Sequence, residues 1–304
     1  MRTRMLPVAF AALASLASSP AFAQTAAGST DWRWSYAAAA FNVFESDLDR
    51  GGSAGVAALY AGLSGVKPID SKLSLSASLR FNLLDFRFSS PTAFGGVAPW
   101  NRIYEPGISV GVSYLLDNGW RLGFVPTVQY SGESGAKFGD AIVWGAVASA
   151  SKTFSPDLTL GVGVGAFSRI EKTSVYPFLI VNWRITEKLR LANPFAAGPA
   201  GPAGLELVYD LGGGWETGVG GAYRSFRFRN SEDAPTPNSI GQAQMIPVFA
   251  RIAKNLTPSI QLELMAGATV GNQLKLYDSS GNRLVEEDQD AAPFVALTFS
   301  GRFR

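Results

Sequence analysis

The residues best suited to chemistry are charged side chains set at alternate positions of apolar segments. Over residues 72–83, KLSLSASLRFNL, leucine, alanine and phenylalanine alternate with lysine, serine, arginine and asparagine. A period of two is typical of a β-strand with one apolar and one polar face. The same alternation places further charges on polar faces, where they could bind an anion or pair with one another: Lys72, Arg80, Arg121, Arg184, Arg190, Arg224, Arg251, Arg302, Glu206, Asp210, Glu216 and Glu263.

Several kinds of catalytic site are excluded by composition, because the chain has no histidine and no cysteine. Ser-His-Asp triads, histidine-ligated zinc and thiolate sites all need one of these residues. A Ser-Lys or carboxylate-only site is compatible with the composition, but no spacing indicates one. We therefore expect no enzymatic activity, no catalytic residue, no cofactor and no protein-bound metal centre.

A glycine motif, Gly161-Val-Gly-Val-Gly165, superficially resembles a nucleotide-binding loop. Its glycines fall at every second position of a strand-like segment, and no helix follows. The motif therefore predicts space on one face of a strand, for a neighbouring aromatic ring or an inward loop.

The N-terminus has the three parts of a secretory signal peptide. Arg2 and Arg4 precede an apolar stretch over residues 6–16, and Ala21-Phe22-Ala23 forms a cleavage site. We predict a signal peptide over residues 1–23 and one exported domain over residues 24–304. Cleavage would leave 24 basic and 24 acidic residues, a balance that disfavours nucleic-acid binding.

The pattern of the rest of the chain predicts strands, and no segment is apolar enough for a membrane-spanning helix. Short connections such as Asp117-Asn-Gly119 alternate with longer polar ones, which predicts an all-β, up-and-down transmembrane β-barrel in the outer membrane of a Gram-negative cell. The hairpin 188–193/204–211 is the weakest part of this pattern, and without it the wall would have twelve strands. Fourteen strand-like segments occur, near residues 32–44, 54–66, 72–88, 104–116, 120–131, 140–154, 158–170, 174–185, 188–193, 204–211, 215–229, 245–254, 260–274 and 292–303.

Aromatic residues gather near both ends of these segments, as expected where a barrel meets the two membrane interfaces. The adjacent leucines Leu83 and Leu84 interrupt one alternation and predict either a bulge or the point of membrane exit. The ring at the short-turn end comprises Trp32, Trp34, Trp120, Phe154, Trp183, Trp215 and Phe303. The predicted ring at the opposite end comprises Phe41, Phe44, Tyr130, Phe226, Phe228 and Tyr277.

These features predict outer-membrane lipid and lipopolysaccharide as partners. The last segment, residues 294–304, resembles the C-terminal strand read by the barrel assembly machinery, although Arg304 follows the final aromatic residue. Among the longer connections, residues 278–291 predict an acidic loop. This loop is either solvated or holds divalent cations that bridge lipopolysaccharide phosphates. Its acidic residues are Glu286, Glu287, Asp288 and Asp290.

Several stretches between residues 176 and 228 resemble a family of uncharacterised bacterial outer-membrane β-barrels, defined as a domain of unknown function. The resemblance implies a barrel and its location, and it brings no substrate or site. It lies in Tyr176-Pro-Phe-Leu, residues 182–191, Asn193-Pro194, residues 201–205, Tyr209, Trp215, Tyr223-Arg224 and residues 226–228.

Charges facing lipid at mid-bilayer would cost about 2–4 kcal/mol each for Arg or Lys, so the charged residues are expected inside the barrel or at its rims. A basic lumen favours a porin-like passive channel for small polar or anionic solutes. The alternative is a structural or surface-interaction barrel, with arginines and carboxylates pairing to occlude the lumen. No pattern indicates the particular solute or the oligomeric state.

Overall fold

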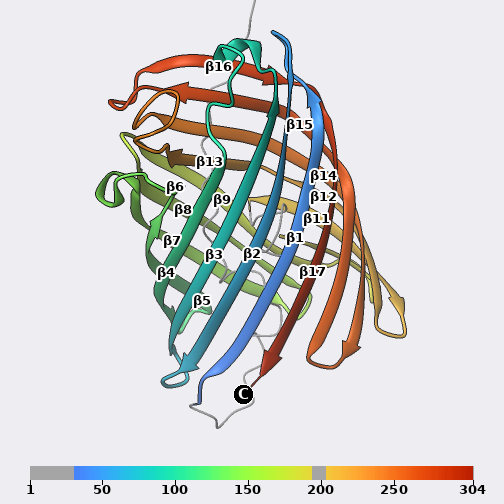
Figure 1. The fold of residues 1–304 in the computed structure, drawn as a ribbon. Helices are drawn as coiled ribbons and strands as arrows, with labels where there is room; N and C mark the ends of the chain where they lie inside the picture. The colour runs from blue at the N-terminus through green and yellow to red at the C-terminus, as the bar shows by residue number, and fades with distance from the viewer. Residues whose placement is uncertain (1–30, 194–202, 304) are drawn as a thin grey trace, which may run out of the picture.

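A computed structural model describes residues 31–193 and 203–303, which form a closed antiparallel β-barrel (Figure 1). No helix within these ranges is long and apolar enough to cross a membrane. The predicted signal peptide lies outside the described residues. The elements are β1 (Arg33–Asp47), β2 (Ser53–Pro68), β3 (Leu73–Ser89), η2 (Thr92–Phe94), β4 (Arg102–Leu115), β5 (Trp120–Tyr130), β6 (Gly132–Glu133), η3 (Phe138–Ala141), β7 (Ile142–Ser155), β8 (Leu158–Arg169), β9 (Thr173–Arg184), β10 (Leu189–Ala192), β11 (Gly204–Gly212), β12 (Trp215–Ala222), β13 (Arg224–Arg229), β14 (Ile240–Thr257), β15 (Ile260–Tyr277), β16 (Arg283–Gln289) and β17 (Ala292–Phe303).

Fourteen strands make the wall: β1 to β5, β7 to β12, β14, β15 and β17. The ring closes where β1 pairs with β17, from Trp34↔Phe303 to Val43↔Phe294. The hairpin predicted at 188–193/204–211 is part of the wall, because β10 pairs with both β9 and β11. The fourteen-strand prediction is therefore confirmed, and the twelve-strand alternative is wrong.

The connections sort into two ends, as predicted. Short turns such as residues 156–157 and 213–214 lie at one end of the barrel. The start of β1 and the end of β17 lie at the same end, where the C-terminus is marked in Figure 1. We call this the short-turn end. Most longer connections, including those with η2 and η3, lie at the opposite long-loop end.

A second, narrower ring closes at the long-loop end. β13 follows β12 in the chain and also pairs with β14. It reaches β6 through the parallel bridge Arg229↔Gly132, and β6 in turn pairs with β4. The isolated bridge Leu48↔Gln289 joins β16 to the end of β1. These pairings define the narrow ring: β1, β2, β3, β4, β6, β13, β14, β15 and β16.

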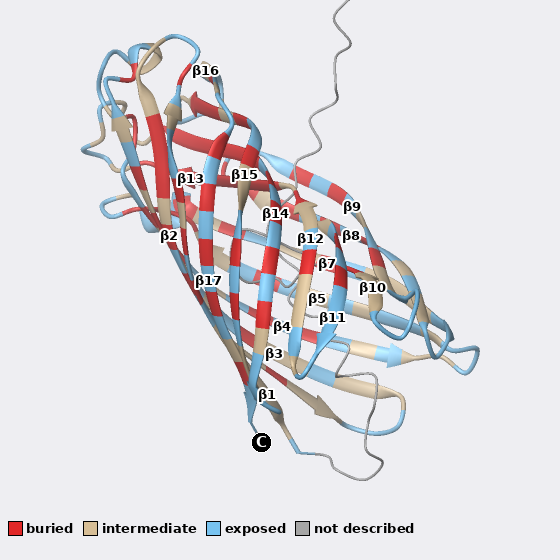
Figure 2. Cartoon of the chain, turned by 90° about the vertical axis from the view of Figure 1, so that its right-hand side faces the viewer, coloured by how far each residue is buried: buried red, intermediate tan, exposed pale blue. Residues whose placement is uncertain are grey.

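Side chains fill the narrow ring, as expected for a barrel of about eight strands. We call this filling the upper apolar core. Figure 2 shows buried residues concentrated towards this end of the barrel, while the short-turn end is mostly intermediate or exposed. Trp100, which has no exposed surface, packs edge-on to Phe86 and Phe228 at centroid distances of 5.9 and 5.3 Å.

This core corrects the predicted aromatic ring at the long-loop end. Phe41, Phe226 and Phe228 are buried inside the barrel as members of the upper apolar core. The strands that carry these residues extend beyond the thickness of a bilayer. In that part of each strand, the apolar side chains point into the barrel. Phe44 is 47% exposed and lies on the outer surface.

Three local predictions have clear outcomes. Of the two explanations for Leu83-Leu84, the bulge is wrong, since β3 keeps one register against β2 throughout, and the membrane exit stays a prediction. The acidic segment is not a loop alone, because Glu286 and Glu287 lie in β16, and Glu287 is buried against Arg50. The glycine motif does make space for aromatic rings: a Cβ on Gly163 or Gly165 would overlap a ring of β9.

Candidate functional site in the lumen

Charged and polar side chains line the inside of the wall between the short-turn end and the upper apolar core. Strand register sets this arrangement, because every second residue of a strand points to the same face. On β3, Ser78 and Arg80 share the inner face, while Leu79 is 55% exposed on the outside. The charged residues then fall into three levels along the barrel.

The lowest level consists of exposed arginines at the short-turn end. Arg121 lies next to the first residue of β5, and its Nη1 is 3.4 Å from Ser113 Oγ. Arg184 forms an exposed ion pair with Asp157 at 3.3 Å. Arg302 donates to the Pro258 carbonyl at 3.4 Å. These three predicted lumen residues are separated from one another.

The second level is a network that we call the lower ionic cluster: Arg190, Arg251, Glu206, Glu216 and Glu263. Arg251, on β14, is its centre. Its Nε contacts Glu206 Oε1, its Nη1 lies 3.2 Å from Glu263 Oε2, and its Nη2 lies 3.6 Å from Glu216 Oε2. Arg190 reaches the same Glu216 oxygen at 3.8 Å. The cluster has a formal charge of −1, from two arginines and three carboxylates.

Sequence and register explain how this network fits. The cross-strand partner of Arg251 on β12 is Gly218. A Cβ at Gly218 would overlap the Glu206 carboxylate, so glycine leaves the room that the ion pair occupies. Glu206 and Glu263 are 4% and 8% exposed, so they require a cation and hydrogen bonds to offset their desolvation.

The third level, midway along the barrel, is the central arginine cluster: Arg80, Arg169, Arg224 and the carboxylate Glu105. Two of the arginines project from the wall strands β3 and β8, and the third projects from β13 of the narrow ring. The charge of Glu105 attracts both Arg80 and Arg169, while Arg80 and Arg224 repel each other. Three arginines and one carboxylate give the cluster a formal charge of +2.

Neutral donors hold Glu105 in place. Its two oxygens accept hydrogen bonds from Ser131 Oγ at 2.7 Å and from Asn82 Nδ2 at 3.1 Å. Arg169 donates from Nη2 to the Ser225 carbonyl at 3.0 Å. The cluster is thus tied to the strands β3, β4 and β13 that form the floor of the narrow ring.

The sequence predicted part of this lumen and missed part of it. Arg80 and Arg224 are brought together, as are Arg251, Glu216 and Glu263. Arg169 and Glu105 were missed, although both lie at alternate positions of their strands and could have been found by the rule that selected Arg80.

The aromatic residues predicted for the short-turn end lie at the ends of their strands. Phe154, Trp183, Trp215 and Phe303 are 42–57% exposed, and Trp120 is half-buried. Lys254 Nζ lies 4.9 Å from the Trp215 ring centroid. Their interfacial role stays a prediction.

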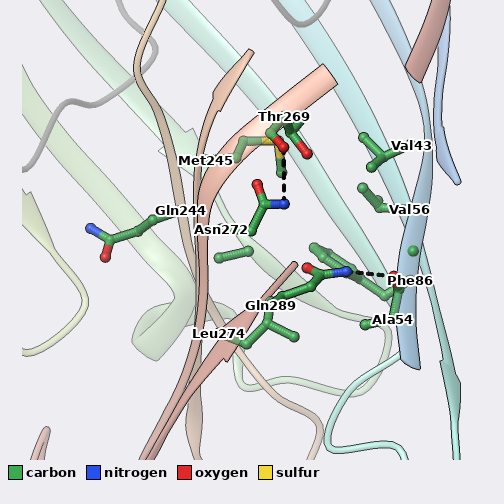
Figure 3. Close-up of a pocket in the computed structure, with 12 residues that line it drawn as sticks. Val43, Ala54, Val56, Phe86, Gln244, Met245, Thr269, Asn272, Leu274 and Gln289 are labelled. Atoms are coloured by element: carbon green, nitrogen blue, oxygen red, sulfur yellow. Dashed lines mark hydrogen bonds between the residues drawn. The ribbon is translucent and has the colours of Figure 1, made fainter. Parts of the chain in front are cut away.

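Above these levels, a small cavity lies inside the narrow ring (Figure 3). Its volume of about 20 Å³ is room for roughly one water molecule. Asn272 and Gln289 point into it from the β15–β16 side and hydrogen-bond to the Thr269 and Ala54 carbonyls. Its remaining lining is mostly apolar.

A closed fourteen-strand barrel with an apolar outer surface and a charged lumen belongs to the architectural class of transmembrane β-barrels. No family model matches the chain, and no curated protein matches it.

Among solved structures, the chain is similar to an outer-membrane channel of Pseudomonas putida F1, with 10% identity, 90% of this chain and 95% of that chain covered, and a TM-score of 0.48. It is also similar to the P. putida toluene transporter TodX, with 10% identity, 90% of each chain covered and a TM-score of 0.41. A third similarity is to the KdgM porin bound to oligogalacturonate, with 6% identity, 88% and 99% covered and a TM-score of 0.36. Similarity at this level conveys neither a solute nor a mechanism.

Proposed function

We propose that the protein is a passive channel of the outer membrane for small polar or anionic solutes. One observation carries the proposal: charged side chains line the membrane-spanning part of a closed barrel and are held inside it by paired contacts. Water and ions are the natural contents of such an interior. The basic central cluster favours anions over cations.

The remaining parts of the proposal concern location and family. An outward face of exposed leucine, valine and phenylalanine residues supports a bilayer position, with lipid and lipopolysaccharide as surroundings. Export by a cleaved signal peptide, insertion by the barrel assembly machinery and membership of an uncharacterised barrel family belong to the same proposal.

The upper apolar core supports a second candidate, a barrel with an occluded lumen and a structural or surface-interaction role. Conduction would require the narrow ring to open or a route around its packed side chains. The charged lumen is the reason to prefer the channel, because an occluded barrel needs no excess of arginine.

Electrophoresis with and without boiling first establishes that the purified protein forms a stable closed barrel. Planar-bilayer recordings of the folded protein should then show discrete conductance steps with anion preference. Arg80→Glu, Arg121→Glu and Arg224→Glu should each shift the reversal potential towards cation selectivity. Arg87→Glu is the matched control, because Arg87 lies on the outer face and bonds to Asn42. Folded protein without discrete steps would refute the channel and leave the occluded barrel.

A further inference from the structure

The central arginine cluster concentrates positive charge in a protected part of the lumen. Arg169 and Arg224 are 4% and 3% exposed, and Glu105, the carboxylate among them, is 5% exposed. Taking ions out of water is costly, and attraction to a counter-charge offsets that cost. Since the formal charge of the cluster is +2, an anion entering it would gain more than at any exposed arginine.

The wall leaves room beside Arg80. Its cross-strand neighbours are glycines on both sides, Gly62 on β2 and Gly107 on β4. A Cβ on Gly62 would have only the Leu79 carbonyl oxygen within 4 Å, at 3.8 Å. Glycine in a strand often marks a place where another group approaches the backbone closely. Room therefore lies on the β2 side of Arg80, whereas on the β4 side a Cβ on Gly107 would lie 3.3 Å from the Gln129 Cβ.

Aromatic rings flank the Arg224 guanidinium group. The Arg224 guanidinium carbon lies 5.5 Å from the Phe226 ring centroid and 6.0 Å from that of Tyr60. On β8 and β9, the rings of Phe167 and Tyr176 are stacked at a centroid distance of 6.0 Å. A guanidinium against an aromatic face presents its N–H edge, which matches the two oxygens of a carboxylate.

We propose that the central arginine cluster binds the carboxylate of a small aromatic acid, with Arg80 and Arg224 holding the carboxylate and the aromatic side chains flanking the ring. This inference deepens the proposed channel function by naming a class of solute for the lumen, and it requires only that the ligand can enter the lumen from solution. The cluster adds a defined binding step to the general preference for anions.

Isothermal titration calorimetry of the folded barrel in detergent tests this, with sodium benzoate, benzyl alcohol and inorganic phosphate as three separate probes. Benzoate should bind, while benzyl alcohol, which lacks the charge, should bind at least tenfold more weakly. Arg80→Gln and Arg224→Gln should each weaken benzoate binding about 10- to 100-fold, the usual effect of losing a hydrogen bond to a charged group. Arg87→Gln, which changes an arginine on the outer face that bonds to Asn42, should leave the affinity unchanged.

Gly62→Val provides a variant that keeps every charge but fills the space beside Arg80, and it too should weaken benzoate binding. Heat-dependent electrophoretic mobility confirms that each variant is folded. Absence of benzoate binding, or phosphate binding as tight as benzoate binding, would overturn the proposed site. Conductance recordings test the channel independently of the binding site. A barrel that conducts but does not bind benzoate refutes only the site. A barrel that binds benzoate but does not conduct refutes only the channel.

Discussion

Replacing Arg251 by methionine should destabilise the barrel strongly. Arg251 contacts three carboxylates at once, and its side chain is 8% exposed. Without it, the buried Glu206 and Glu263 would lose their shared cation, while methionine would preserve most of the apolar stem. Breaking a buried ion pair by removing one partner typically costs about 3–5 kcal/mol. We expect a loss of unfolding free energy in that range at neutral pH.

Urea unfolding of the protein in lipid vesicles, followed by tryptophan fluorescence, measures this loss. Arg184→Met is the matched control, since it removes an arginine whose partner, Asp157, is about half exposed. Exposed pairs contribute about 0–1 kcal/mol, so the control should remain close to the wild type. The loss for Arg251→Met should shrink as the pH falls, because a protonated carboxyl no longer requires a cation.

A combined variant separates charge from packing. Changing Glu206 and Glu263 to glutamine in the Arg251→Met background removes the stranded charges and nearly preserves the side-chain volumes. Its unfolding free energy should recover most of the loss. If the combined variant is as unstable as Arg251→Met alone, or if Arg251→Met loses under about 1 kcal/mol, the argument from buried charge is refuted.

Four further changes test other parts of the barrel. Gly165→Val should cost about 1–3 kcal/mol by overpacking against a β9 ring, read as a lower urea midpoint. Asn193→Ala removes bonds to the Val181 amide and to the Leu179 and Gly204 carbonyls, and should cost about 2 kcal/mol by the same measurement. Trp100→Ala should cost about 3–5 kcal/mol and increase single-channel conductance if the upper apolar core limits flow. Asn282→Ala should raise the pKa of Asp278, which the Asn282 side-chain hydrogen bond holds below its usual value; carbon NMR titration measures it, and an unchanged pKa would contradict that cause.

The wall was predictable because each strand carries its own alternation. Register then follows from keeping apolar residues on one face, so neighbouring strands needed no further information. The narrow ring was not predictable in this way. Its closure depends on Arg229 meeting Gly132 across the barrel, and no local pattern in either segment encodes that meeting.

The arrangement of charged residues in the lumen was likewise predictable only in part. The inward direction of Arg80 and Arg224 follows from alternation alone. Their proximity to Arg169 depends on the path of β13, which stays paired with β14 while its Ser225 carbonyl accepts a hydrogen bond from Arg169. Sequence therefore indicated which side chains face inward, while the three-dimensional path of β13 decides which of them meet.

The two faces of β3 exchange roles along its length, and this exchange has a physical cause. Towards the short-turn end, Leu79 is exposed on the outside and Arg80 faces inward. Further along, the same unbroken register puts Asp85 outside, paired with Arg102 at 3.0 Å, and buries Leu84 completely. A bilayer is crossed by about 9–11 residues, whereas β3 has 17.

The surplus of β3 must therefore lie in water, where an apolar side chain is stable only inside the barrel. An interior filled in that way requires a narrower ring than fourteen strands provide, and β6 and β13 supply it. A reversal of apolar and polar faces without a register shift thus locates the membrane boundary in the sequence itself. Moving that boundary tests the reasoning: Asp85→Leu together with Arg87→Leu should extend the lipid-facing surface, and depth-dependent quenching by lipid probes should then find the segment deeper in the bilayer. An unchanged depth would contradict this explanation of the exchange.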